Sequence, residues 1–113
     1  VCAVDAGRTL NPLNLEAQVA NTTLADISAP LHEAITLKSG QVQQHNFPDY
    51  PLLRMGQSPH SVEVYSVDTG ADPASFDDVV AASAAPALAN AVYAATTVRV
   101  RRLPLLPELL RLL

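Results

Sequence analysis

Apolar residues in the first third of the chain pass from a continuous run to a helical spacing. Residues 1–4 are all apolar and a polar turn at 5–8 ends the run, which is typical of a short strand buried on both faces. The Asn-Pro pair at 11–12 favours a turn, and we expect Asn14 to cap a helix after it. Pro30 should stop or kink this helix, because proline lacks an N–H group and its ring crowds the preceding turn. The apolar positions of the helix are Leu15, Val19, Leu24, Ile27 and Leu31.

The middle of the chain predicts a hairpin followed by a long loop. Residues 34–38 and 41–47 flank Ser39-Gly40, a two-residue connection that favours a tight turn between antiparallel strands. Prolines interrupt residues 48–59, so we expect a loop there. A loop of this length with several apolar residues is expected to rest on a neighbouring surface. Its apolar anchors are Tyr50, Leu52, Leu53 and Met55.

The last third alternates short predicted elements. Residues 61–67 alternate in polarity and predict a strand, and residues 68–76 form a polar link. The alanine-rich stretch 86–96 predicts a helix with proline in its first turn. Residues 98–101 predict a short edge strand, and a last helix is expected over 108–113. Together these elements predict an α+β fold of short strands with two main helices, in a single partial domain over residues 1–113.

The alanine-rich helix is expected to be buried. Its small side chains would let another backbone approach closely, and its larger ones would fill volume. The small residues are Ala87, Ala91, Ala94 and Ala95, and the larger ones are Leu88, Val92 and Tyr93.

Composition limits the classes of protein to which the chain can belong. With 113 residues there is room for one domain, and 49% hydrophobic residues drawn largely from alanine and valine predict a thin or borrowed core. The net charge is −4, and the basic residues gather only at Arg99, Arg101 and Arg102, so a nucleic-acid partner is not expected. No apolar stretch reaches the roughly 20 residues that a membrane span requires.

Cysteine and histidine usage predicts neither a disulfide framework nor a metal site. Cys2 is the one cysteine, so no disulfide can form within the chain, and the compartment, cytoplasmic or periplasmic, stays open. His32, His45 and His60 share no metal-ligand spacing. The sequence opens directly on the predicted strand at residues 1–4. We therefore expect the chain to be a piece of a larger protein.

Four collinear strings carry more information than periodicity does. They are VDAGRTLNP at 4–12, NFPDYPLLRM at 46–55, APALANA at 85–91 and RRLPL at 101–105. In this order and at these separations they resemble the C-terminal end of the molybdopterin-binding large subunit of the xanthine dehydrogenase and aldehyde oxidase family, above all its isoquinoline 1-oxidoreductase and bacterial aldehyde dehydrogenase branch. The resemblance covers nearly the whole chain.

The resemblance implies a molybdenum hydroxylase, which oxidises an aldehyde or an N-heterocycle with oxygen derived from water. It implies a molybdenum–molybdopterin cofactor, in the cytosine dinucleotide form, that performs the redox chemistry while the protein positions it. The implied partners are the remainder of the large subunit, an iron–sulfur subunit and a flavin or cytochrome subunit. The isolated chain is not expected to turn over substrate.

Two departures from the family pattern concern the site itself. The family's Gln-Val-Glu-Gly-Gly string contacts the pterin through its glutamine, and here Gln18 keeps that position while Ala20, Asn21 and Thr22 replace the acid and both glycines. Counting back from residue 85 without a gap places Asp78 where the family's glutamate base stands. Aspartate is one methylene shorter, and a general base must reach hydrogen-bonding distance of its proton. A degenerate base site is therefore expected.

Each candidate residue also has a structural interpretation. Asp78 can be an acidic residue stabilised at the start of a helix, and Gln18 a solvated helix residue. Asp5 and Arg8 favour a structural turn with a local ion pair. The three arginines can line a solvated edge strand or touch an anionic cofactor. The leucines of the last helix are expected to bury against the parent subunit; they are Leu109, Leu110, Leu112 and Leu113.

Two functions therefore remain open from the sequence. The chain can form one wall of the molybdopterin pocket of a molybdenum hydroxylase, or it can be a non-catalytic structural or interaction module derived from this family.

Overall fold

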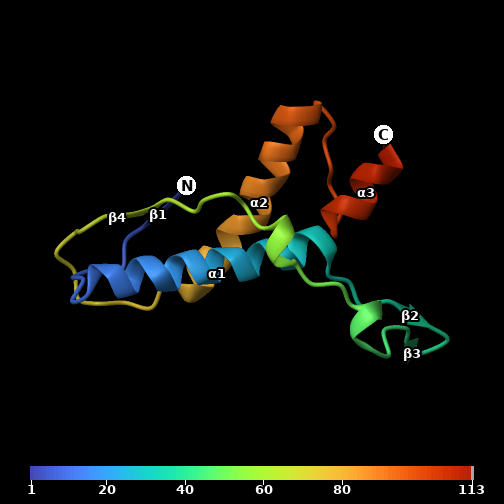
Figure 1. Cartoon of the computed structure of the whole chain (residues 1–113), viewed down its shortest axis with the longest axis horizontal. Helices are drawn as coiled ribbons and strands as arrows, with labels where there is room; N and C mark the ends of the chain where they lie inside the picture. Colours follow the sequence, from blue (N-terminus) through green and yellow to red (C-terminus); the bar gives the residue numbers. More distant parts are fainter. Residues whose placement is uncertain (113) are drawn as a thin grey trace.

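Three helices and two small sheets form the structure, a computed structural model that describes residues 1–112 apart from the side chains of residues 77–79 (Figure 1). The predicted α+β class is confirmed. The elements are β1 (Cys2–Val4), α1 (Pro12–His32), β2 (Leu37–Lys38), β3 (Gln41–Val42), β4 (Val64–Ser66), α2 (Asp77–Thr96) and α3 (Leu105–Leu112), with short 3-10 turns at Phe47–Asp49 and Met55–Gln57.

Helix α1 begins earlier than predicted. The cap is Asn11, not Asn14: the Asn11 side-chain oxygen accepts a hydrogen bond from the Asn14 amide at 3.1 Å. Pro12 then occupies the first helical position, where its missing N–H group costs no hydrogen bond. An Asn-Pro pair thus begins the helix directly, and no separate turn precedes it.

Of the stop or kink predicted at Pro30, the stop is wrong, because α1 continues to His32. Pro30 lies in the last turn, so its ring removes one hydrogen bond close to the end of the helix. The Glu33 amide still closes that turn by donating to the Ala29 carbonyl at 3.1 Å. The loss is small enough for the helix to tolerate.

The core lies where α1 crosses the parallel pair β1–β4. Val19 is completely buried, and Leu15, Val4 and Ala6 surround it, while Cys2, Val64 and Phe76 pack against this cluster from the side. Both strands were predicted, and their register pairs Cys2 with Val64 and Val4 with Ser66. Burial of β1 on both faces is not observed, because Ala3 is exposed. The cluster is thin, as the composition predicted.

The predicted hairpin forms around Ser39-Gly40. Lys38 pairs with Gln41 across the turn, and both turn residues have positive φ, 52° for Ser39 and 76° for Gly40. Two positive φ values match the twist of an antiparallel pair, which explains the two-residue connection. The paired strands are shorter than predicted and are exposed.

Helix α2 corrects three predictions about the last third of the chain. It begins at Asp77, so Pro86 lies in the interior of the helix rather than in its first turn. The alanines on both sides of Pro86 favour continuation of the helix. The prediction that the small side chains of this helix are buried is wrong for this chain, because Ala87, Ala91, Ala94 and Ala95 are all exposed. The expected edge strand at 98–101 does not form. Instead Arg99 folds back onto α2, 3.7 Å from the Tyr93 ring centre and 3.0 Å from the Asn90 side-chain oxygen.

Helix α3 begins at Leu105, ahead of the prediction, and Leu105 is its buried anchor against the rest of the fold. Leu110 and Leu112 are exposed, and Leu113 lies outside the described residues. No helix within residues 1–112 has the length and apolar character that crossing a bilayer demands.

Candidate functional site

Helix α1, which carries Gln18, lies against α2, whose first turn contains Asp78 (Figure 1). We call the region where α1 meets the start of α2 the corner. Two cavities of about 240 Å³ each open there, and the half-buried Phe76 ring lines both of them. Ser83 and Val80 of α2 line the first, together with residues 2–5 of β1 and its turn. Gln18, Arg8 and other residues around the start of α1 line the second. Phe76 lines the Gln18 cavity and lies two residues before Asp78 in the chain. It therefore links the surroundings of the two candidate residues.

Gln18 is exposed on α1 and faces the second cavity beside Arg8, Asn14 and Leu15. The neighbouring residue Val19 is completely buried in the core. The helix therefore directs a neutral amide, with one donor and one acceptor group, toward the opening. The same position is compatible with a solvated helix residue.

Residues 20–22 do not form the backbone cradle that glycines at these positions would allow. They lie inside continuous helix, with Asn21 exposed and with Ala20 and Thr22 half-buried. A cavity of about 240 Å³ is also below the range of about 300 to 1,000 Å³ typical of small-molecule sites. The residues described here do not fit a pterin cofactor as a complete site.

Asp78 lies in the first turn of α2, but its side chain is outside the described residues, as are those of Asp77 and Val79. Two residues later Val80 is buried, 4% exposed, and its amide donates to the Phe76 carbonyl at 3.0 Å. The first turn of α2 is thus attached to the core corner. The assignment of Asp78 as a base stays a prediction.

The Asp5 turn is structural, as its alternative interpretation held, but without the predicted ion pair. The Asp5 carboxylate accepts hydrogen bonds from the Gly7 amide at 2.9 Å and from the Thr69 hydroxyl at 3.0 Å. The Arg8 amide donates to the Ala71 carbonyl at 2.9 Å. The turn therefore holds the 68–74 link against the start of the chain. Gly7 has φ +68°, and a Cβ added there would collide with the Asp72 carbonyl oxygen.

The remaining charged residues are spread over the surface. Among residues 1–112, excluding the side chains of 77–79, the one ion pair is Glu108–Arg111 in α3, and the hydrogen bond from Arg111 lowers the pKa of Glu108. Arg101 and Arg102 are exposed. In the same part of the chain no three His, Cys, Asp or Glu side chains gather closely enough to hold a metal ion.

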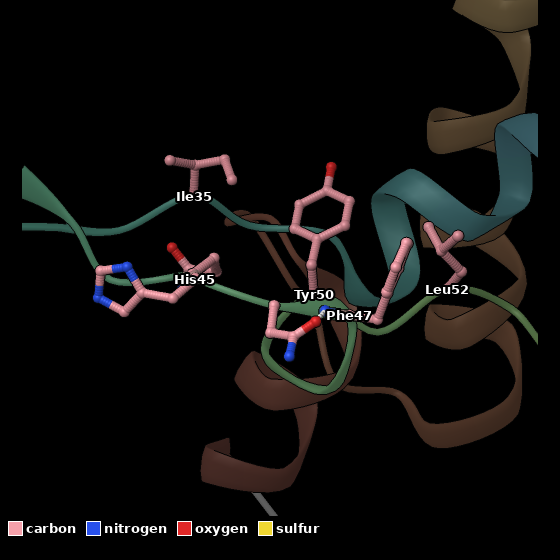
Figure 2. A pocket seen from close by; sticks show the side chains of 7 residues that line it. Ile35, His45, Phe47, Tyr50 and Leu52 are labelled. Carbon is pink, nitrogen blue, oxygen red and sulfur yellow. Dashed lines mark hydrogen bonds between the residues drawn. The ribbon is translucent and has the colours of Figure 1, made fainter.

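A second region with cavities was missed as a site by the sequence. Two hollows, of about 450 and 610 Å³, are both lined by Phe47, Tyr50 and Leu52. Ile35 and residues 44–46 complete the first, and the second lies within the loop at 47–56. Figure 2 shows Phe47 and Tyr50 rising from the loop toward the segment that carries Ile35, while His45 points away from them. The sequence feature that could have indicated this region was the set of apolar loop residues, which were predicted only to anchor the loop on a neighbouring surface.

Polar contacts to the end of α1 hold this loop in place. The Tyr50 hydroxyl donates to one Glu33 oxygen at 2.8 Å, and the buried Ser28 hydroxyl donates to the other at 2.6 Å. Ser28 in turn accepts the Leu53 amide at 2.9 Å. The hydrogen bond to Glu33 raises the pKa of Tyr50, because it stabilises the protonated phenol. We call these four residues the Glu33 clip.

Comparison with known proteins gives matches along nearly the whole chain. It is 34% identical over 108 residues to the beta subunit of isoquinoline 1-oxidoreductase from Brevundimonas diminuta, covering 96% of this chain and 14% of that protein. It is 27% identical over 108 residues to a nicotinate dehydrogenase subunit of Pseudomonas putida, covering 95% of this chain and 9% of that protein.

A third relative is the membrane-bound aldehyde dehydrogenase [pyrroloquinoline-quinone] of Gluconacetobacter polyoxogenes, 27% identical over 104 residues, which cover 92% of this chain and 13% of that protein. No protein-family model matches the chain. The chain therefore spans 14% or less of the length of these relatives. The matches confirm the resemblance that the four strings indicated.

Proposed function

We propose that this chain, a relative of the molybdopterin-binding large subunits of the xanthine dehydrogenase and aldehyde oxidase family, works as one partial domain of such a subunit and forms one wall of its cofactor pocket. The observation that carries the proposal is the similarity over 96% of the chain to only 14% of an oxidoreductase subunit. The activity would be hydroxylation of an aldehyde or an N-heterocycle, and the domain would comprise residues 1–113.

The amount of exposed surface supports a role inside a larger assembly. The chain exposes 8144 Å², whereas a compact monomer of 12.0 kDa exposes about 6,000 Å². Its radius of gyration is 16.6 Å, against about 13 Å for a compact domain of this length. The sheet β1–β4 has only two strands, although parallel sheets are generally larger and covered on both faces. Further polypeptide would complete both the sheet and the core.

The cofactor proposed for the assembly is molybdenum–molybdopterin in its cytosine dinucleotide form. When bound it would supply the redox chemistry, and this chain would contribute the amide of Gln18 from the wall of the second cavity. The close backbone approach that glycines permit would have to come from elsewhere in the subunit, because residues 20–22 carry side chains in continuous helix. An iron–sulfur subunit, with a flavin or cytochrome subunit, would complete the assembly as electron acceptors.

Molybdenum and pterin content of the purified large subunit tests this role. We expect the Gln18→Ala subunit to retain the cofactor about two- to tenfold less well, as the loss of one hydrogen bond requires. Glu16→Gln is the control, because Glu16 is also exposed on α1 but does not line the cavity. A wild-type subunit that contains no molybdenum would contradict the proposal. Equal retention of the cofactor by both variants would show that Gln18 does not contact it.

For the base, we propose Asp78, because the gapless count from residue 85 assigns it to the position of the family's glutamate. Its carboxylate reaches less far by about one C–C bond, so the subunit should be slow. A positioned general base contributes about 10²- to 10⁴-fold. In the family the glutamate lies in a Gly-Glu-Pro-Gly string, so Asp78→Glu combined with Asp77→Gly, Val79→Pro and Val80→Gly should give a visible gain. Asp77→Glu alone is the control and should give none. Full cofactor content with unchanged activity after the repair would show that position 78 is not the base.

A non-catalytic structural or interaction module is the second candidate. The side chains at 20–22 and the shorter carboxylate at 78 favour it, because both weaken a cofactor site. It predicts a stable assembly that lacks molybdenum and pterin and that the Asp78→Glu repair does not activate. Metal analysis of one purified sample therefore separates the two candidates.

A further inference from the structure

We propose that residues 34–57, the hairpin and the loop that follows it, form a docking arm whose apolar surface packs on the remaining polypeptide of the large subunit. This inference rests on the proposed function, because it takes its partner from there. Four residues make up the surface: Ile35, Phe47, Leu52 and Met55.

The docking arm carries four large apolar side chains that are mostly exposed. Met55 is 94% exposed and Phe47 is 91% exposed, while Ile35 and Leu52 are more than half exposed. The hollows of about 450 and 610 Å³ lie between these side chains and share Phe47 and Leu52 in their walls. Contiguous exposed apolar surface of this kind marks an interaction site rather than ordinary surface.

The surface is held in a fixed shape before any partner binds. Asn46 and Asp49 cap the turn that carries Phe47, with the Asn46 side chain accepting the Phe47 amide at 2.8 Å and Asp49 accepting the Asn46 amide at 3.2 Å. The Glu33 clip fastens the next residues to α1 through Tyr50 and Leu53. A preorganised surface loses less conformational entropy on binding, so its apolar area contributes more fully to affinity.

The remaining large-subunit polypeptide is the occupant that the observations favour. The isoquinoline 1-oxidoreductase relative matches this chain over 14% of its own length, so in a subunit of that kind the partner would be present at high local concentration. The whole chain exposes roughly 2,000 Å² more than a compact monomer, which leaves room for an interface of the roughly 800 Å² per partner that a stable complex buries. The edge of the first hollow is polar at Gln44, His45 and Asn46, and Arg54 adds one positive charge at the second. This composition fits an apolar partner surface with a polar edge.

Met55 provides a direct test, because it is 94% exposed here and is the only methionine of residues 1–113, so mass spectrometry of the peptide that contains it reports its oxidation within the subunit. In the purified large subunit, with Cys2 blocked by N-ethylmaleimide, hydrogen peroxide should oxidise Met55 at least tenfold more slowly than it oxidises a synthetic peptide of residues 46–57. Phe47→Ser should restore rapid oxidation. Leu13→Ser should not, because Leu13 is a similarly exposed apolar residue of α1 outside the arm.

Three results would overturn the docking arm. They are oxidation of Met55 in the subunit at the rate of the peptide, purification of the chain without further polypeptide, and protection that disappears on dilution, which would assign the surface to a second copy of the chain. Molybdenum content measured on the same samples separates the two proposals. Protected Met55 without molybdenum refutes the proposed function alone, whereas bound molybdenum with rapidly oxidised Met55 refutes the docking arm alone.

Discussion

The corner around Val19 and the docking arm at residues 34–57 are held together by different interactions. In the corner, apolar side chains from β1, α1 and the start of α2 enclose Val19, which has no exposed surface. In the arm, the apolar side chains point outward, and hydrogen bonds to Glu33 and Ser28 fix the backbone. Burial therefore stabilises the corner, whereas polar contacts shape the arm and leave its apolar surface available. Stability and recognition are consequently separated along the chain.

Shortening a core leucine should give the largest effect. Leu15 is 7% exposed and lies in the corner, whereas Leu13 of the same helix is 78% exposed. Leu15→Ala should lower the free energy of unfolding by about 2 to 5 kcal/mol, because it removes buried methyl groups and leaves a cavity. Leu13→Ala should change it by about 0.5 kcal/mol or less. Urea unfolding followed by circular dichroism measures both, and equal losses would mean that the corner is not the core.

Enlarging an alanine of α2 probes how far the corner extends. Ala84 is 9% exposed, and Ala91, two turns later, is exposed. Ala84→Leu should overpack the contact and cost about 1 to 3 kcal/mol. Ala91→Leu should be nearly neutral in the isolated chain. Thermal unfolding compares them, and a large loss at Ala91 would place that face against another element.

Ser28 connects the two regions, since it is buried in α1 and accepts the Leu53 amide of the arm. Ser28→Ala leaves that amide without its partner, so we expect a cost of about 1 kcal/mol. Hydrogen exchange should show the loss of protection at Leu53 and not at Val19. The exposed Ser66 supplies the control, Ser66→Ala, which should alter neither amide.

The smallest effect concerns pH. Because the hydrogen bond to Glu33 raises the pKa of Tyr50 above 10.0, the folded state holds the phenolic proton more tightly than the unfolded state does. The contribution of this bond is therefore present below about pH 10 and lost as the pH rises through the raised pKa. Titration of tyrosine absorbance should show one phenol ionising at lower pH in Glu33→Gln. Glu63→Gln should leave the titration curve unchanged. An unchanged curve in Glu33→Gln as well would contradict the contact between Glu33 and Tyr50.

The sequence by itself determined the local elements and the family resemblance. Two adjacent residues that tolerate positive φ specify the hairpin at Ser39-Gly40, and the spacing of Leu15 and Val19 specifies the buried face of α1. Both depend on short-range geometry, which a pattern records directly. The four collinear strings indicated the relatives, because they preserve residues and separations together.

The sequence-based predictions were wrong where other interactions opposed the local secondary-structure propensity. Proline suggested a stop at residue 30 and a start at residue 86, yet both prolines lie inside helices. Alternation suggested a strand at 98–101, but Arg99 instead stacks on Tyr93 of the preceding helix. In each case, interactions with residues several positions away outweighed the local preference.

Only the tertiary structure decided which distant residues meet. The parallel pairing of β1 with β4, the position of Phe76 between the Gln18 cavity and α2, and the contact of Tyr50 with Glu33 all join segments separated by long stretches of chain. No periodicity encodes such contacts, because they depend on how helices and strands pack rather than on how each one forms. Sequence thus named the candidate residues, and packing brought Gln18 to the corner while it left the arm exposed.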